Sequence, residues 1–277
     1  MPKSHPMKRL FSFLLLLSFS ISVTAQKEVK LKKVLELKMP DGAGTNSSGI
    51  TYHPESKRYY ASFAGNARHP FAIFDHKGKR LSDDDQKALF DVRGLWWNPS
   101  IKKFCANGYY ENGWITYKLD KKGMPVDIEQ LYSGMIQPDE QSVAAFNPRS
   151  NDVFFLNGQV VWTIPAETGM VEDEDIRLYV GAANRSEALD LEFYEDEDHL
   201  PSDYNHTLIY TGVKKGEFGI LNHYDKQVEL YDRKTGYMTQ ILILPDDAPA
   251  AKMLCFGFAN GIYWLFDKEE RTWVGYK

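Results

Sequence analysis

The chain has 277 residues, and its 33 Lys and Arg against 38 Asp and Glu give a formal net charge of −5. Nucleic acids bind to cationic surfaces, so this acidic balance and the scattered basic residues argue against nucleic acid as the partner. With 43% hydrophobic and 14% aromatic residues, the chain can bury a sizeable core. We expect a single globular domain after the first 25 residues, and a monomer.

Residues 1–25 have the features of a secretory signal peptide. Three basic residues among the first nine precede the apolar residues 10–23, and small residues follow up to Ala25. The apolar stretch is short for a membrane-spanning helix. We predict cleavage after Ala25 and a mature protein of residues 26–277 that is secreted or periplasmic, with no transmembrane segment after cleavage.

Residues 29–37, VKLKKVLEL, predict an early β-strand. This strand lies before the repeated units that follow, and the last of those units is one strand short. Pairing of the two would close a ring of sheets and remove two free strand edges.

A unit of an apolar run, a His-Pro or Asn-Pro pair, a polar turn and an aromatic-rich run then recurs. The copies read GITYHPESKRYYASF from Gly49, GLWWNPSIKKFCANG from Gly94 and SVAAFNPRSNDVFFLNG from Ser142. Their prolines, Pro54, Pro99 and Pro148, lie 45 and 49 residues apart. Because proline cannot donate to a β-ladder, each pair marks the end of a strand. The period is that of a four-stranded propeller blade.

Each of the first three units predicts three or four strands. We expect them at residues 49–52, 58–63, 71–75 and 88–92; at 95–97, 104–106 and 114–119; and at 143–146, 153–156 and 160–164. Third strands end in turns such as Asp75-His76-Lys77-Gly78, with a glycine available for positive φ.

The last two units are irregular. We expect strands at residues 189–194, 207–211, 218–223, 227–231 and 240–244 in the fourth, and at 253–258, 262–266 and 272–276 in the fifth. The sequence therefore predicts an all-β fold, a single β-propeller of five blades closed by the N-terminal strand. Six blades is the alternative, if the extra strand of the fourth unit belongs to another blade.

Two cysteines and three tryptophans lie within the strand patterns. Cys105 and Cys255 are in distant units, so we expect buried, apolar thiols, with a disulfide only if ring closure brings their strands together. Trp96, Trp97 and Trp162 are expected in the core between sheets.

The strand, Asn-Pro or His-Pro turn, aromatic strand and Asp-x-x-Gly turn together resemble the superfamily of propellers with NHL, YVTN and SMP-30-like repeats. The resemblance covers essentially the whole chain after the leader. Enzymes of the SMP-30 and paraoxonase kind hold a divalent metal at the channel mouth with Glu, Asn and Asp side chains, so the resemblance implies a search for such residues there.

In a propeller, the first strand of each blade lines the central channel. The loops that enter these strands share one face with the loops between second and third strands, and such loops carry most binding sites. Candidate ligand-binding residues at this mouth are Arg68, Arg93, Tyr109, Tyr110, Glu140, Glu187 and Lys252. Aromatic and Arg side chains are frequent anchors of bound partners.

Acidic and amide side chains of the same loops suggest two kinds of chemistry. Ca²⁺ or another divalent cation binds several oxygen ligands, and the candidates are Glu140, Asn184, Glu187 and Asp190. Alternatively, two of Asp139, Glu140 and Glu187 would be the acid and base of glycoside cleavage, which needs two carboxylates at a fixed separation. The spacing identifies no such pair and no catalytic residue.

The sequence favours a secreted binding module for a protein or a carbohydrate. The alternative is a metal-dependent hydrolase or lactonase of the SMP-30-like type. Aromatic or apolar side chains filling the channel mouth would favour the first function, whereas three or more converging carboxylate or amide oxygens would favour the second.

Overall fold

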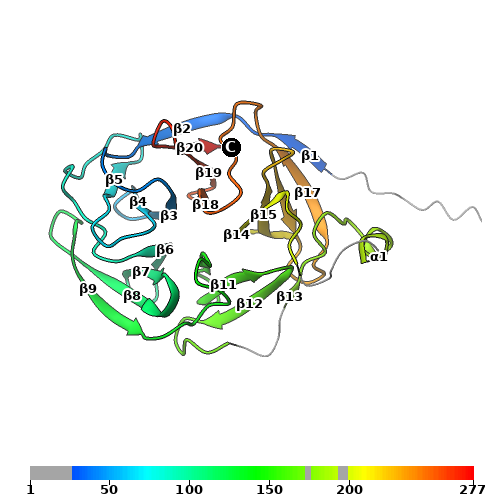
Figure 1. Cartoon of the computed structure of the whole chain (residues 1–277), viewed down its shortest axis with the longest axis horizontal. Coiled ribbons are helices and arrows are strands. Elements are labelled where there is room, and N and C mark those ends of the chain that lie inside the picture. The colour runs from blue at the N-terminus through cyan, green and yellow to red at the C-terminus, as the bar shows by residue number, and fades with distance from the viewer. Residues whose placement is uncertain (1–26, 172–175, 193–198) are drawn as a thin grey trace, which may run out of the picture.

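The computed structural model describes residues 27–171, 176–192 and 199–277, which form five small sheets around a central axis (Figure 1). These residues form a five-bladed β-propeller, as the repeat predicts, and they also include one short α-helix. The predicted signal peptide, residues 1–25, lies outside the described residues. No helix in the described part of the chain is long and apolar enough to cross a membrane.

The first three blades follow the repeat in chain order. Blade 1 consists of β3 (Ser47–His53), β4 (Arg58–Phe63) and β5 (Phe71–Asp75). Blade 2 consists of β6 (Val92–Asn98), β7 (Lys103–Gly108), β8 (Trp114–Leu119) and β9 (Pro125–Tyr132). Blade 3 consists of β10 (Ala145–Asn147), β11 (Asp152–Asn157), β12 (Val160–Pro165) and β13 (Ile176–Arg177).

The last two blades each take a strand from the N-terminal segment. Blade 4 consists of β14 (Tyr204–Val213), β15 (Gly216–Asn222), β16 (Gln227–Tyr231), β17 (Met238–Ile243) and β1 (Lys27–Lys30). Blade 5 consists of β18 (Phe256–Ala259), β19 (Ile262–Asp267), β20 (Thr272–Tyr276) and β2 (Lys33–Lys38).

Ring closure by the N-terminal strand is confirmed, and it is more extensive than predicted. β2 pairs antiparallel with β20, while β1 adds in parallel to the outer edge of β17 in the neighbouring blade. Leu31, between the two strands, is 7% exposed and packs in the core that blades 4 and 5 share. The segment thus links the two blades across the point where the ring closes.

The prolines of the repeat stand in turns that the preceding residue stabilises. Asn98 Oδ1 accepts a hydrogen bond from Ser100 N at 2.9 Å, and Asn147 Oδ1 accepts one from Arg149 N at 3.0 Å. In blade 1 the imidazole of His53 does the same, since Nδ1 accepts from Ser56 N at 3.2 Å. The His/Asn-Pro pair recurs because it ends a strand and caps the following turn.

Two predicted strands do not form, and each has a local reason. Residues 88–92 are not the fourth strand of blade 1: Val92 begins β6, while Ala88 and Phe90 are buried in the core between blades 1 and 2. Blade 1 therefore has three strands, and only the isolated bridges Phe74↔Arg80 and Pro70↔Lys87 follow β5.

The predicted strand 189–194 is wrong because the chain forms α1 (Arg185–Glu192) there. Its start is a capping box: Asn184 Oδ1 accepts from Ser186 N at 3.0 Å, and Glu187 Oε2 accepts from Ala183 N at 2.8 Å. Without this strand, unit four has only the four strands of one blade in addition to β1. The count is five blades, and the alternative of six is wrong.

Apolar side chains fill the spaces between blades. Trp264, Trp273 and Tyr59, each at most 1% exposed, join blades 5 and 1. Trp96 is also buried, as predicted, whereas Trp97 and Trp162 are partly exposed.

Cys105 and Cys255 are buried free thiols in different blades, which confirms their prediction. Burial raises the pKa of the Cys105 thiol to about 12 and that of Cys255 to about 11. Both thiols are therefore protonated and unreactive at neutral pH.

Candidate functional site: an aromatic cavity in the central channel

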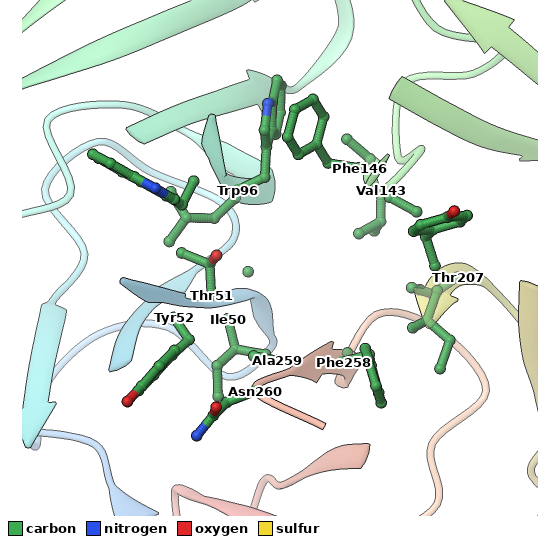
Figure 2. Close-up of a pocket in the computed structure, with 18 of the residues that line it drawn as sticks. Ile50, Thr51, Tyr52, Trp96, Val143, Phe146, Thr207, Phe258, Ala259 and Asn260 are labelled. Atoms are coloured by element: carbon green, nitrogen blue, oxygen red, sulfur yellow. The ribbon is translucent and has the colours of Figure 1, made fainter. Parts of the chain in front are cut away.

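The inner strands of all five blades surround a cavity of about 330 Å³ in the central channel (Figure 2). The channel has an entry end, where the inner strands begin, and an exit end, where they turn back at the His/Asn-Pro pairs. The cavity lining reaches Pro54, Pro99, Pro148 and Asn260, all at the exit end. It is within the range of small-ligand sites, near its lower limit.

Several residues at the entry end of the channel are buried in the contacts between blades. Ser47, Ser142, Asn205 and Cys255, at the starts of four inner strands, are at most 7% exposed. Hydrogen bonds link neighbouring blades here: Ser48 Oγ donates to Val92 O at 2.8 Å, and Asn107 Nδ2 donates to Ser142 O at 2.8 Å.

Two further bonds continue this belt of contacts around the ring. Asn205 Nδ2 donates to Leu254 O at 2.9 Å, and Cys255 N donates to Ser47 O at 2.9 Å. Gly94 is needed in the belt, because a Cβ there would lie 2.5 Å from Ala144 N. These contacts hold neighbouring blades together at the entry end of the channel.

Aromatic side chains dominate the open end of the cavity. Each blade contributes one that is partly exposed and lines the cavity: Tyr52, Trp97, Phe146, Tyr210 and Phe258. Neighbouring rings hold several of them in place. Trp97 lies 4.0 Å from His53 and 4.9 Å from Phe104 between ring centroids, and Tyr52 lies 4.8 Å from Tyr59.

The lining carries no Asp, Glu, Lys, Arg or His among the residues that the structure describes. The polar side chains of the lining carry hydroxyl groups and one amide. Those of Thr51, Thr207 and Asn260 are labelled in Figure 2. The others are the tyrosine hydroxyls and Ser48, whose hydroxyl donates to Val92 O of the next blade. Asn260 Nδ2 donates to Tyr59 Oη at 2.8 Å, and its carbonyl oxygen is an acceptor. The cavity can bind by apolar contact and neutral hydrogen bonds, but it holds no side chain suited to acid–base catalysis at neutral pH.

None of the seven predicted ligand-binding residues lines this cavity. Four of them do come together on the entry side. Arg93 lies with its guanidinium 4.8 Å from the centroid of the Tyr109 ring, and Tyr109 Oη donates to Glu140 Oε2 at 3.0 Å. Tyr110 joins them, since its N–H donates to Glu140 O at 3.3 Å.

Arg93 is occupied by structural contacts. Only 4% of its side chain is exposed; Nε donates to Gln141 Oε1 at 2.8 Å, and Nη1 pairs with Asp91. A guanidinium with its donors paired inside the protein has little left for a ligand. Arg68 and Lys252, by contrast, are exposed on other loops.

The proposed metal ligands are divided between two places. Glu140 is in the loop before β10, whereas Asn184, Glu187 and Asp190 lie at or in α1, outside the ring (Figure 1). Asn184 Nδ2 donates to Glu187 Oε1 at 2.6 Å within the capping box. No group of three or more His, Cys, Asp or Glu that could hold a metal occurs among the described residues.

The five lining aromatics were not among the predicted site residues, although the repeat contains a signal for them. Tyr52, Trp97 and Phe146 each stand directly before the His-Pro or Asn-Pro pair of their unit. Their common position places them at the same height in the channel. Tyr210 and Phe258 stand in units without the pair, so the sequence pattern does not mark them.

No protein-family model and no curated protein sequence matches the chain. Solved structures are similar to it. Glutaminyl cyclase from Myxococcus xanthus matches 91% of this chain and 98% of its own at 10% identity, with a TM-score of 0.53. The calcium-binding protein regucalcin from Agrobacterium tumefaciens matches 91% and 95% at 10% identity, with a TM-score of 0.50. A streptogramin B lyase matches 85% and 65% at 17% identity, with a TM-score of 0.39.

At identities this low, the likeness to the first two structures shows a shared fold alone. The chain is a β-propeller built from five blades. It covers 98% of the first and 95% of the second of these neighbours.

Proposed function

We propose that this chain is an exported, non-enzymatic binding module that holds its ligand in the exit end of the central channel. The observation that carries the proposal is the lining: one partly exposed aromatic residue from each of five blades and, among the described residues, no ionisable side chain other than tyrosine. Aromatic groups in a rigid concavity provide binding energy by excluding water and filling space. Export is inferred from the leader pattern of residues 1–25.

The alternative, a metal-dependent hydrolase, has less support from the same geometry. Its chemistry requires oxygen ligands that converge on a cation, or carboxylates placed around a scissile bond. Regucalcin is described as a calcium-binding protein, so the binding experiment includes a divalent cation. The candidate carboxylates Glu140 and Glu187, however, already accept hydrogen bonds from Tyr109 and Asn184.

A binding screen with matched variants tests this function. Saccharides, short peptides and indole compounds are screened against the protein by ligand-observed NMR, with and without millimolar Ca²⁺. The double variant Trp97→Ala/Phe258→Ala should weaken any hit by at least about 30-fold, because aromatic contacts contribute about 1–3 kcal/mol each. The control is Tyr110→Ala/Tyr224→Ala, which removes two exposed aromatics, 48% and 75% exposed, outside the cavity.

Loss of binding must be separated from loss of folding. The variant Trp97→Leu/Phe258→Leu keeps apolar volume at both positions, and its melting temperature should stay close to that of the wild type. The proposal fails if every hit binds the cavity variants and the wild type equally well, or if a hit is turned over in a Ca²⁺-dependent reaction.

A further inference from the structure

We infer that the cavity binds the terminal ring of a neutral saccharide, an inference that rests on the proposed function and names its ligand. Four properties of the site lead to this class: its size, its aromatic walls, the backbone groups of its inner strands and its lack of charge.

The size limits what can enter. A volume of about 330 Å³ is near the lower limit of small-molecule pockets, so the site takes one or two rings and excludes a folded protein segment. A larger ligand can therefore insert only one end, and the rest of it must lie outside, over the exit-end turns.

The walls suit a ring that has both apolar faces and polar edges. The face of an aromatic ring is electronegative, so it attracts the polarised C–H groups on the face of a pyranose. Trp97, Phe146 and Phe258 offer such surfaces around the opening. A purely apolar ligand would use the aromatic walls, but it would leave the polar groups of the channel without partners.

The inner strands supply those polar groups. Each of β3, β6, β10, β14 and β18 is at the end of its sheet and has a hydrogen-bonded strand on one side only. Its other side presents backbone N–H and C=O groups toward the channel. With the hydroxyls of Thr51 and Thr207, this gives mixed donors and acceptors of the kind that sugar hydroxyl groups can satisfy.

The absence of charge on the described lining selects against ionic ligands. A carboxylate or ammonium moved into this cavity would lose its hydration and gain no counter-charge, because no Asp, Glu, Lys, Arg or His lines it. Uronic acids, sialic acids and amino sugars with a free amine should therefore be excluded.

The test is a glycan array in which each neutral oligosaccharide is also printed with its terminal ring replaced or capped by a uronic or sialic acid. We expect a subset of neutral glycans to bind and the signal to fall at least about tenfold on the capped counterparts. A hit is then titrated by calorimetry against the wild type, Trp97→Ala, Trp97→Leu and the control Tyr224→Ala. Trp97→Ala should weaken binding at least about tenfold, and Tyr224→Ala should leave it unchanged.

The outcomes separate this inference from the proposed function. If no neutral glycan binds, or if the charged-capped glycans bind as well as the neutral ones, the saccharide inference is overturned. If peptides or indole compounds then bind in a manner that depends on Trp97 and Phe258, the binding function stands with another ligand. If nothing bound depends on those two residues, both proposals fall.

Discussion

Glu229 is a carboxyl group inside blade 4 with only 2% of its surface exposed. It is surrounded by donors: Tyr204 Oη donates to Oε1 at 2.9 Å, Gln227 Nε2 donates to Oε1 at 3.0 Å, and Tyr231 Oη donates to Oε2. Burial raises the pKa of Glu229, although these hydrogen bonds act in the opposite direction. Titration of this one side chain therefore makes the free energy of unfolding depend on pH.

The sign of that dependence follows from the raised pKa. Glu229 destabilises the fold when ionised, so its contribution is fully present below the pKa of the unfolded chain, about 4.3, and is lost as pH rises through the folded pKa. Urea unfolding of Glu229→Gln across pH 4–8 should therefore lose less stability with rising pH than the wild type does.

A surface carboxylate supplies the matched comparison. The Lys103 ammonium, 2.8 Å away, lowers the pKa of Glu129, so its contribution is lost as pH falls through the folded pKa. Glu129→Gln should change the dependence of the free energy of unfolding on pH in the opposite sense. If this dependence is the same in Glu229→Gln as in the wild type, Glu229 is not the titrating group.

Arg93 shows what sequence reasoning at the residue scale does not capture. An Arg beside the channel looks like an anchor for a ligand, and the structure instead pairs it with Asp91 and Gln141. Gln141 is 48 residues away in the chain. No local pattern indicates which donors will be used by the protein itself.

The turns are the elements that the sequence predicts best. A side-chain acceptor that bonds the N–H two or three residues later acts within four residues, so its effect is visible in the sequence. Asn98, Asn147 and His53 all do this at their turns. Strand 189–194 failed for a comparable local reason, because the capping box of Asn184 and Glu187 favours a helix.

The Asn147 turn gives a prediction at the element scale. Asn147 is 4% exposed; its Oδ1 accepts from Arg149 N, and its Nδ2 donates to Ser150 Oγ at 2.6 Å. Asn147→Ala removes both hydrogen bonds, whose partners Arg149 and Ser150 are exposed, and should cost about 1–2 kcal/mol in the free energy of unfolding. Asn147→Asp keeps the acceptor and should cost less, as measured by urea unfolding. Equal losses in the two variants would contradict the turn-capping role.

At the scale of the whole molecule, residues 27–38 hold the ring together. They supply outer strands to two blades, and Leu37, which is 0% exposed, enters the core between blades 5 and 1. In a closed ring every blade packs against two neighbours. The weakest point is therefore the junction where the two ends of the chain meet.

Deletion of residues 30–37 should expose the edges of β17 and β20 and cause unfolding or aggregation, measured by light scattering and thermal denaturation. Within the intact ring, Leu37→Ala should cost about 2–5 kcal/mol through the cavity that it leaves. Val34→Ala, on the same strand but 49% exposed, should stay within about 0.5 kcal/mol. A deletion variant that stays soluble with the same melting temperature would disprove the closure role.

The sequence by itself determined the blade period, most of the strands, the turns and the closing strand. These features depend on short-range hydrogen bonding, on proline's missing donor and on the alternation of apolar residues, all of which act within a few positions. The tertiary structure alone decided which five partly exposed aromatics line the cavity in the channel. That choice depends on the packing of inner strands from blades as far apart in sequence as Ser47 and Cys255, which no local pattern encodes.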